Sequence, residues 1–327
     1  MKRRTALTRF ATAFAALAAT LCLPPASAQS AFPAHPITIV VPNAPGGAID
    51  ILARLLEQRL RTAWGQPVIV VYKPGAGTVV GTDFVAKSKP DGHTMGLVIT
   101  GHMINPSLRR SLPFNTLKDL SGVTLLATSP VLISATPGLP ANNVAELIAL
   151  ARKEPGKLNY ASPGIGSSMH LAGEMLKAMA ALDITHVPYN GAGQAYPEVF
   201  AGRVQLLIDP LFSSLPHIKA GRMKPIAVLS PQRVPSSPEI PAAAETLPGY
   251  TVQSVFGLVV PSGTPRDVVN RIRTDVVAAL QSPEVKAKLE EIGLTPVGNT
   301  PEEFDAFIRA EIDRWAKVVK ASGAVAD

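Results

Sequence analysis

Residues 36–50 read Pro-Ile-Thr-Ile-Val-Val-Pro-Asn-Ala-Pro-Gly-Gly-Ala-Ile-Asp, and this stretch decides the fold. Its β-branched run, 37–41, predicts a buried strand. The segment from Pro42 to Gly47, rich in proline and glycine, predicts a turn. Residues 49–61 follow with apolar side chains at helical spacing. The sequence here therefore predicts a strand, a glycine-rich loop and a helix in direct succession.

The same succession recurs along the chain. We expect strands at 68–71, 95–99, 159–161, 204–208 and 226–229, and helices at 79–85, 167–180, 267–280 and 301–321. Strands that alternate with helices predict α/β layers with largely parallel sheets. Two extended segments, 123–135 and 251–260, are expected to cross between two lobes. The first lobe would then comprise residues 29–125 and 253–327, the second residues 126–252, with a ligand cleft between them.

The first 28 residues have the three parts of a cleavable secretory signal. A basic start is followed by an apolar run, 10–23, which is too short to span a bilayer. Ala26-Ser27-Ala28 then has the small-x-small form that signal peptidase accepts. We expect cleavage after Ala28, which removes Cys22 and leaves a mature protein in the bacterial periplasm.

Composition and charge exclude several classes of protein. With 327 residues, 46% apolar and 17% charged, the chain can bury a core and is not a disordered tail. A single cysteine excludes an internal disulfide and a cysteine metal cluster, and no H-E-x-x-H pair occurs, so neither metal nor cofactor is expected. Four of the 31 basic residues and none of the 24 acids lie in residues 1–28, so the rest carries only +3 of the net +7. Nucleic acid is therefore not an expected partner.

Glycine-rich loops between strands and helices are the most informative feature. They lie at 42–50, 73–78 and 162–168, with a fourth at 189–193. A helix start offers unpaired N–H groups and about half a positive charge. Several such starts facing one cleft would hold an anion without Lys or Arg. Any single loop also has an ordinary interpretation, in which glycine permits the turn and serine caps the helix.

Four polar residues leave two interpretations open. His102 follows the strand end at Thr100 and either points into the cleft or is a polar loop residue. His170 either contacts ligand or makes a hydrogen bond within its turn. Asp209 either accepts from a ligand ammonium or hydroxyl group, or fixes the turn at Pro210. For Asp50 we favour a role in capping or stabilising the first helix over a catalytic one.

These motifs resemble a known family over essentially the whole mature chain. Besides 36–50 with Ala53-Arg54, they are Lys73-Pro-Gly-Ala-Gly77, residues 85–94, Ile104-Asn-Pro106, Leu112-Pro-Phe114, residues 162–168 with 170–174, and residues 186–191. The sequence resembles the substrate-binding receptors of tripartite tricarboxylate transporters, the Bug family. The resemblance implies the type II periplasmic-binding-protein fold, two α/β lobes that close on a small carboxylate and hand it to membrane transporter subunits.

The resemblance also implies where the ligand binds. On one wall it points to Ala44, Pro45, Gly46 and Gly47 and to Gly75, Ala76, Gly77 and Thr78. On the other wall it points to Gly166, Ser167 and Ser168. We add Thr100, Asn190 and Asp209 to the expected ligand-binding set. The family often has lysine at position 190, so asparagine there bears on ligand preference.

Three functions remain to be weighed. The leading hypothesis is a monomeric, non-enzymatic receptor for a di- or tricarboxylate, an acidic amino acid or an aromatic acid. The second is a sensory receptor with the same binding module, which presents its closed form to a sensor kinase. The third is a periplasmic hydrolase, for which only Ser167 or Ser168 near His170 is suggestive.

Overall fold

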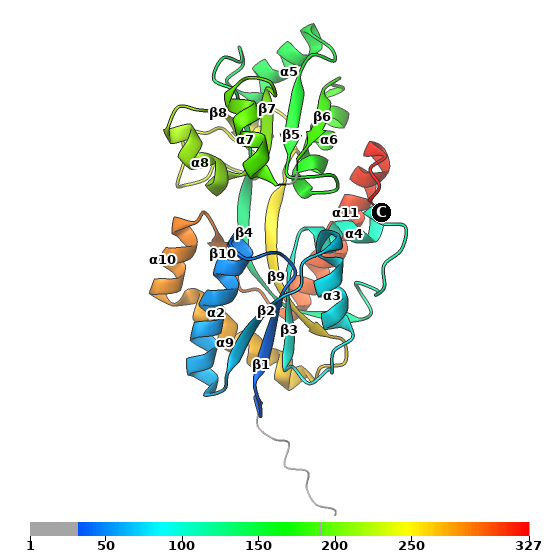
Figure 1. The fold of residues 1–327 in the computed structure, drawn as a ribbon, viewed down its shortest axis with the longest axis vertical. Coiled ribbons are helices and arrows are strands. Elements are labelled where there is room, and N and C mark those ends of the chain that lie inside the picture. Colours follow the sequence, from blue (N-terminus) through cyan, green and yellow to red (C-terminus); the bar gives the residue numbers. More distant parts are fainter. Residues whose placement is uncertain (1–31, 190, 327) are drawn as a thin grey trace, which may run out of the picture. The chain divides into compact units, whose positions relative to one another are not determined.

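The computed structural model describes residues 32–189 and 191–326 (Figure 1). The expected signal segment with Cys22 and the expected ligand residue Asn190 lie outside the described residues. The fold below is that of the compact unit that begins at His35. Within the described part of the chain, no helix is both long enough and apolar enough to cross a bilayer.

The strands and helices that the sequence predicts are present, with boundaries that differ by a few residues. The structure also has elements that were not predicted, among them helices at 101–108, 144–153, 211–219 and 283–291. The strands are β1 (Ile37–Val41), β2 (Val68–Tyr72), β3 (Thr94–Ile99), β4 (Leu120–Ala135), β5 (Asn159–Ser162), β6 (Thr185–Pro188), β7 (Leu206–Pro210), β8 (Lys224–Val228), β9 (Gln253–Pro261) and β10 (Thr295–Pro296). The helices are α2 (Ala48–Trp64), α3 (Val79–Ala86), α4 (Gly101–Leu108), α5 (Val144–Lys153), α6 (Ser168–Ala180), α7 (Ala192–Phe200), α8 (Leu211–Lys219), α9 (Arg266–Gln281), α10 (Pro283–Glu291) and α11 (Pro301–Ser322), with short 3₁₀ turns at Ala76–Thr78 and Ala243–Glu245.

The described strands form one curled sheet with two groups of strands. Its order is β2-β1-β3-β9-β4-β7-β5-β6, with β8 and β10 also paired to β4. We call β1–β3 the first strand group and β5–β8 the second strand group. The long strands β4 and β9 pair with each other and join the groups, because β9 also pairs with β3, and β4 with β7 and β8 (Figure 1).

The two segments expected to cross, 123–135 and 251–260, correspond to β4 and β9. Strand direction differs from the expectation of largely parallel sheets. Parallel pairing holds within each group, for β1 with β2 and β3 and for β5 with β6 and β7. The central pairs β3–β9, β9–β4 and β4–β7 are antiparallel. The cause is that β4 leaves the first strand group for the second and β9 returns, so the two must run in opposite directions.

Burial fixes the position of the first glycine-rich loop. Ile37, Ile39 and Val41 on one face of β1 are fully buried, and Val40 on the other face is 1% exposed, as expected for a strand covered on both faces. Helix α3 packs against the end of this strand, since a Cβ on Gly81 would lie 2.9 Å from the Cα of Pro42. The carboxyl ends of β1, β2 and β3 therefore share one edge, from which α2, α3 and α4 begin.

Candidate binding cavity between the strand groups

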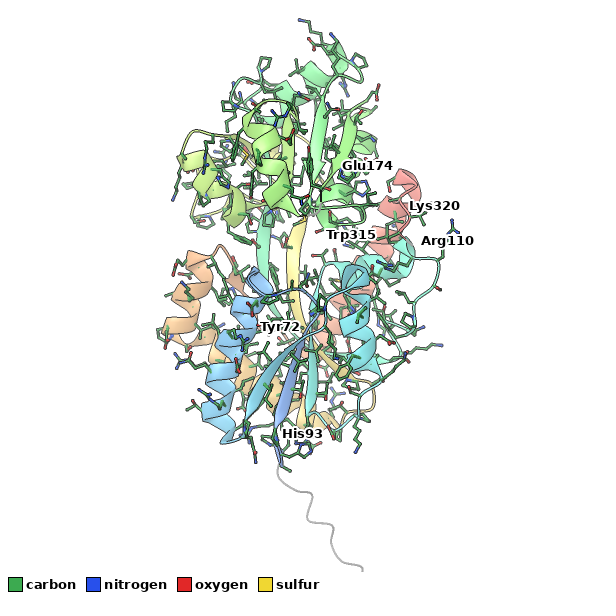
Figure 2. The ribbon with its side chains drawn as sticks, viewed as in Figure 1. Tyr72, His93, Arg110, Glu174, Trp315 and Lys320 are labelled. Carbon is green, nitrogen blue, oxygen red and sulfur yellow. The ribbon has the colours of Figure 1, made fainter. Side chains whose placement is uncertain are left out.

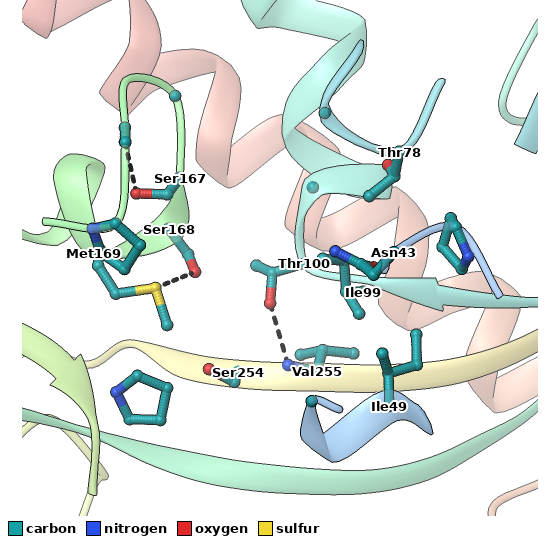
Figure 3. Close-up of a pocket in the computed structure, with 18 of the residues that line it drawn as sticks. Asn43, Ile49, Thr78, Ile99, Thr100, Ser167, Ser168, Met169, Ser254 and Val255 are labelled. Atoms are coloured by element: carbon teal, nitrogen blue, oxygen red, sulfur yellow. Dashed lines mark hydrogen bonds between the residues drawn. The ribbon is translucent and has the colours of Figure 1, made fainter. Parts of the chain in front are cut away.

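A cavity of about 690 Å³ lies at the carboxyl ends of the strands (Figure 3). Such a volume suits a small organic molecule. The first strand group contributes the loops after β1, β2 and β3, and the second contributes the loop after β5 and the end of β7. Residues 254–256 of β9 complete the wall.

The first loop, 42–47, is held from behind by an acid of the helix that it precedes. The N–H of Gly46 donates to Oδ2 of Asp50 at 2.8 Å, and the hydroxyl of Tyr72 donates to Oδ1. The Tyr72 hydrogen bond above all, with help from the Gly46 amide, holds the pKa of Asp50 below its ordinary value. Asp50 thus stabilises the connection between the loop and α2, one of the two structural roles that we favoured for it, but it does not cap the first amides of the helix.

The start of α2 offers hydrogen-bond donors to the cavity. Ala48 and Ile49 line the cavity, and their N–H groups meet no acceptor within the described residues. The residue before the helix is Gly47, whose lack of a side chain leaves these amides uncapped. The Oδ1 atom of Asn43, on the same wall, is buried without a hydrogen-bond partner in the described part of the chain.

The second loop has a strained backbone. Ala76, Gly77 and Thr78 all have positive φ, at 45°, 58° and 82°, although only one of them is glycine. Helix α4 supports the loop, because Nδ2 of Asn105 donates to the carbonyl of Gly77 at 3.0 Å. Gly77 and Thr78 line the cavity, and the amide of Gly77 lacks an acceptor among the described residues. Successive amides in such a turn form a concave site for an anion.

In the third loop, 163–167, backbone N–H groups donate hydrogen bonds to side chains of the adjoining helix start. Ser167 caps α6, since its Oγ accepts from the N–H of His170 at 3.1 Å and donates to the carbonyl of Gly164 at 2.7 Å. The N–H of Gly166 donates to Nδ1 of His170 at 3.1 Å. His170 therefore makes the hydrogen bond within the turn that was one of its two interpretations, and it is not on the cavity wall.

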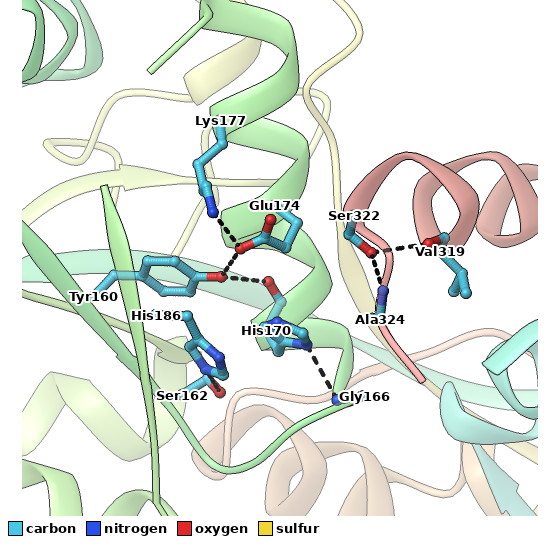
Figure 4. A network of polar contacts seen from close by, with 10 residues as sticks. All are labelled: Tyr160, Ser162, Gly166, His170, Glu174, Lys177, His186, Val319, Ser322 and Ala324. Carbon is cyan, nitrogen blue, oxygen red and sulfur yellow. Dashed lines mark hydrogen bonds and ion pairs between the residues drawn. The ribbon is translucent and has the colours of Figure 1, made fainter. Parts of the chain in front are cut away.

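A buried polar network lies behind the third loop (Figure 4). The ring of His186 stacks on that of His170 with centroids 4.0 Å apart, and its Nε2 lies 2.7 Å from Oγ of Ser162. Burial lowers the pKa of both rings, that of His186 to about 4, so both are neutral at neutral pH. The hydroxyl of Tyr160 donates to Glu174 at 2.7 Å. The network anchors the loop to β5, β6 and α6.

The serines of the described cavity wall do not contact a base. Ser167 faces the backbone N–H of His170 rather than its ring. The hydroxyl of Ser168 donates to the sulfur of Met169 at 3.3 Å. Ser162, which does touch an imidazole, is fully buried and off the cavity wall. Within the described residues, no serine on the cavity wall is hydrogen-bonded to a basic side chain.

Asp209 brings a buried carboxyl group to the cavity. It lies at the end of β7, is 2% exposed, and accepts from the hydroxyl of Tyr196 at 2.6 Å. Burial raises its pKa to about 7, so the carboxyl changes its charge near neutral pH. Thr100 has a structural contact, because its Oγ1 accepts from the N–H of Val255 at 3.0 Å. Ser254 lines the cavity with a hydroxyl that has no partner among the described residues.

Arg109 is a residue of the cavity wall that sequence reasoning missed. It follows α4, and a Cβ on Gly77 would lie 3.0 Å from its Nη2 atom. Its Nε lies 3.4 Å from Oδ1 of Asn105. Among the described residues it is the only Arg or Lys that lines the cavity. The nearby motif Ile104-Asn-Pro106 was the signal that marked this segment.

The residues expected to bind ligand fall into three sets. Ten of them line the cavity: Ala44, Gly47, Gly75, Gly77, Thr78, Thr100, Gly166, Ser167, Ser168 and Asp209. Pro45, Gly46 and Ala76 belong to the same loops without lining it, and Asn190 is outside the described residues. His102 is neither in the cleft nor in a polar loop, because it is 2% exposed and lines a separate cavity beside Asp305 and Arg309.

Two strand groups joined by two strands, with a cavity lined by helix starts, define a two-lobed solute-binding protein. The sequence matches the family described as tripartite tricarboxylate transporter family receptor over residues 52–324. The chain belongs to this family of periplasmic solute-binding receptors, as its motifs indicated.

Several known proteins are similar to this chain over nearly its full length. BugT of Bordetella pertussis is 35% identical over 303 residues, which cover 92% of this chain and 93% of BugT. Rpa4515 of Rhodopseudomonas palustris, solved with adipate, is 36% identical with a TM-score of 0.80, over 90% of this chain and 99% of that one. MatC of the same organism, solved with bound malate, is 31% identical with a TM-score of 0.75, over 88% and 100%.

Proposed function

We propose that this chain is a non-enzymatic periplasmic receptor that captures a small dicarboxylate. It would then deliver the ligand to the membrane subunits of a tripartite tricarboxylate-type transporter. The observation that carries the proposal is the set of N–H groups without an acceptor among the described residues at Ala48, Ile49 and Gly77 on the cavity wall. Adipate and malate, the ligands of two solved relatives, are both dicarboxylates.

In this proposal the two carboxylates bind different walls. One takes the amides of the loops 44–47 and 75–78, where Pro45, Gly46 and Ala76 shape the backbone, and Arg109 adds a positive charge. The other reaches the third loop at Gly166, Ser167 and Ser168. Thr100 and Asp209 flank the ligand, and position 190 stays a predicted contact. Amides in a low-dielectric cavity hold an anion without the desolvation cost of several buried cations.

We further propose that ligand capture closes two lobes, residues 29–125 with 253–327 and residues 126–252. The linking strands β4 and β9 would act as the hinge, since both boundaries fall in or beside them. Residues 1–28 would direct export and be removed in the process. Small-angle scattering with and without ligand tests the closure, and intact mass of the exported protein tests cleavage after Ala28.

A binding screen on the purified mature chain tests the function. We expect adipate, malate or a related dicarboxylate to raise Tm and to bind at micromolar or lower Kd by calorimetry, whereas the corresponding monoamide binds far more weakly. No binding by any di- or tricarboxylate, acidic amino acid or aromatic acid would contradict the proposal. Uptake of the labelled ligand by cells that lack the gene then separates transport from sensing.

A further inference from the structure

Two histidines and an aspartate meet at the end of the first strand group opposite the cavity. His35 lies just before β1 and His93 directly before β3, next to Asp91 in the preceding turn. The two strands are parallel neighbours, with Thr38 paired to Thr94, and the N–H of Thr38 donates to the carbonyl of His93 at 2.8 Å. Parallel strands start at the same edge, so this register brings the two histidines together. Figure 2 shows His93 at this end of the first strand group.

The three side chains are close enough to share one ion. The rings of His35 and His93 stack with centroids 3.6 Å apart and an interplanar angle of 18°. Nδ1 of His93 lies 3.3 Å from Oδ1 of Asp91. One donor atom from each of the three residues lies within 4.8 Å of the other two. The N–H of His93 also donates to Oδ1 of Asp91 at 2.9 Å, which fixes the carboxylate in the turn.

We propose that His35, Asp91 and His93 form a binding site for a late first-row divalent metal ion, with zinc as the reference ion. Two imidazole nitrogens and one carboxylate oxygen suit zinc, nickel or copper better than magnesium or calcium, which prefer oxygen ligands only. Zinc bonds of about 2.0–2.2 Å require a slightly tighter cluster than this one. His35 is exposed, so its ring can rotate out of the stack to complete the site. Water would take the remaining position.

Such a site would act on stability rather than on ligand binding. The ion would tie the residue that precedes β1 to the turn that precedes β3, and the cavity begins at the other end of these strands. The expectation of no metal site rested on local motifs. This cluster has no local sequence motif, because its two histidines are far apart in the sequence and are brought together only by strand pairing.

Calorimetric titration of the untagged mature protein with Zn²⁺ tests the site. We expect one ion per chain at micromolar Kd, a rise in Tm of about 3 °C or more at saturation, and no such response to Mg²⁺ or Ca²⁺. His35→Phe and His93→Phe keep a ring for the stack but remove the nitrogens, so each should weaken Zn²⁺ binding at least about tenfold. His217→Gln, in helix α8 between β7 and β8, is the control and should bind Zn²⁺ as the wild type does.

Two further measurements keep the test decisive if a phenylalanine variant folds poorly. Asp91→Asn retains an acceptor for the His93 amide and should still weaken Zn²⁺ binding. Co²⁺ bound to the wild type should show the visible absorption of a four-coordinate nitrogen and oxygen site, and the variants should lose it. Zn²⁺ affinity that is equal in wild type, His35→Phe and Asp91→Asn, or no one-to-one binding in the wild type, would overturn the proposal. Dicarboxylate titration of the same variants reports the cavity separately.

Discussion

The first and third glycine-rich loops share one design and use it in opposite ways. Each links a strand end to a helix start on the cavity wall. In the first loop, Gly47 caps α2 without a side chain, and the amides of Ala48 and Ile49 stay without an acceptor among the described residues. In the third loop, Ser167 and His170 take up the amides of the turn and of α6.

The difference separates binding from support. An uncapped helix start directs its partial positive charge at whatever enters the cavity. A capped and hydrogen-bonded turn has fewer donors to give but keeps a fixed shape, which lowers the entropy lost when ligand binds. We therefore expect changes in the first loop to act mainly on affinity, and changes in the third loop to act on both stability and affinity.

The largest effect is expected for Gly47→Val. The backbone of Gly47, with φ −90° and ψ 174°, accepts valine, and an added Cβ meets nothing within 4 Å. The side chain would occupy cavity space beside the open amides of α2 and should lower dicarboxylate affinity about 100-fold, or roughly 2.7 kcal/mol. Calorimetry of the purified variant measures this.

Gly138→Val is the matched control for that change. Gly138 also has open space around an added Cβ and no positive φ, but it does not line the cavity. Its affinity should equal that of the wild type. Equal affinities for Gly47→Val and Gly138→Val would show that the first loop does not bind the ligand.

Arg109→Gln should have the next largest effect. Arg109 stands beside the second loop, on the side with the open amides, and a carboxylate gains from a nearby cation. We expect dicarboxylate affinity to fall about tenfold, and its dependence on ionic strength to weaken. Arg110→Gln, next in sequence and off the cavity wall, is the control. No change in Arg109→Gln would mean that amides alone hold the charge.

The same comparison shows what sequence reasoning can reach. Residues 36–50 predict strand, loop and helix because each depends on local pattern, and the glycine loops could be placed on one edge by the rule for parallel strands. The sequence did not predict that the amides of the first loop are open while those of the third loop are hydrogen-bonded. Whether an amide is open depends on a partner such as His170, and Arg109 reaches the cavity only because α4 packs beside the second loop. The central strands were expected to be parallel because local patterns do not record strand direction.

Asp209 predicts a pH dependence that the amide walls alone would not give. An unfolded aspartate ionises near pH 4, whereas burial raises the pKa of Asp209 to about 7, with Tyr196 as its hydrogen-bond partner. Between about pH 4 and about pH 7 the native state keeps a proton that the unfolded state has released. The free energy of unfolding therefore falls as the pH rises through this range.

Ligand affinity should follow the same proton. An ionised Asp209 repels a dicarboxylate, so affinity should fall from about pH 6 to about pH 8, by at most about tenfold per pH unit. Asp209→Asn cannot ionise and should flatten the profile. Calorimetry of dicarboxylate binding from pH 6 to pH 8, in the wild type and in Asp209→Asn, tests whether Asp209 causes this pH dependence. A slope that survives in the variant would assign the titration to another group.

The smallest effect, and the sharpest test of the comparison, comes from two helix caps. Ser167 caps α6 on the cavity wall, and Asn143 caps α5 away from it by accepting from the N–H of Glu146 at 2.9 Å. Replacement of either by alanine should cost about 1 kcal/mol of stability, measured by urea unfolding. Only Ser167→Ala should also weaken dicarboxylate binding, by roughly threefold, because the third loop loses its fixed shape.

If both variants bind as the wild type does, the third loop supports the fold alone and the two loops differ more than we propose. If Ser167→Ala loses as much affinity as Gly47→Val, the third loop contributes as much to binding as the open amides do, and the division between a binding wall and a supporting wall fails.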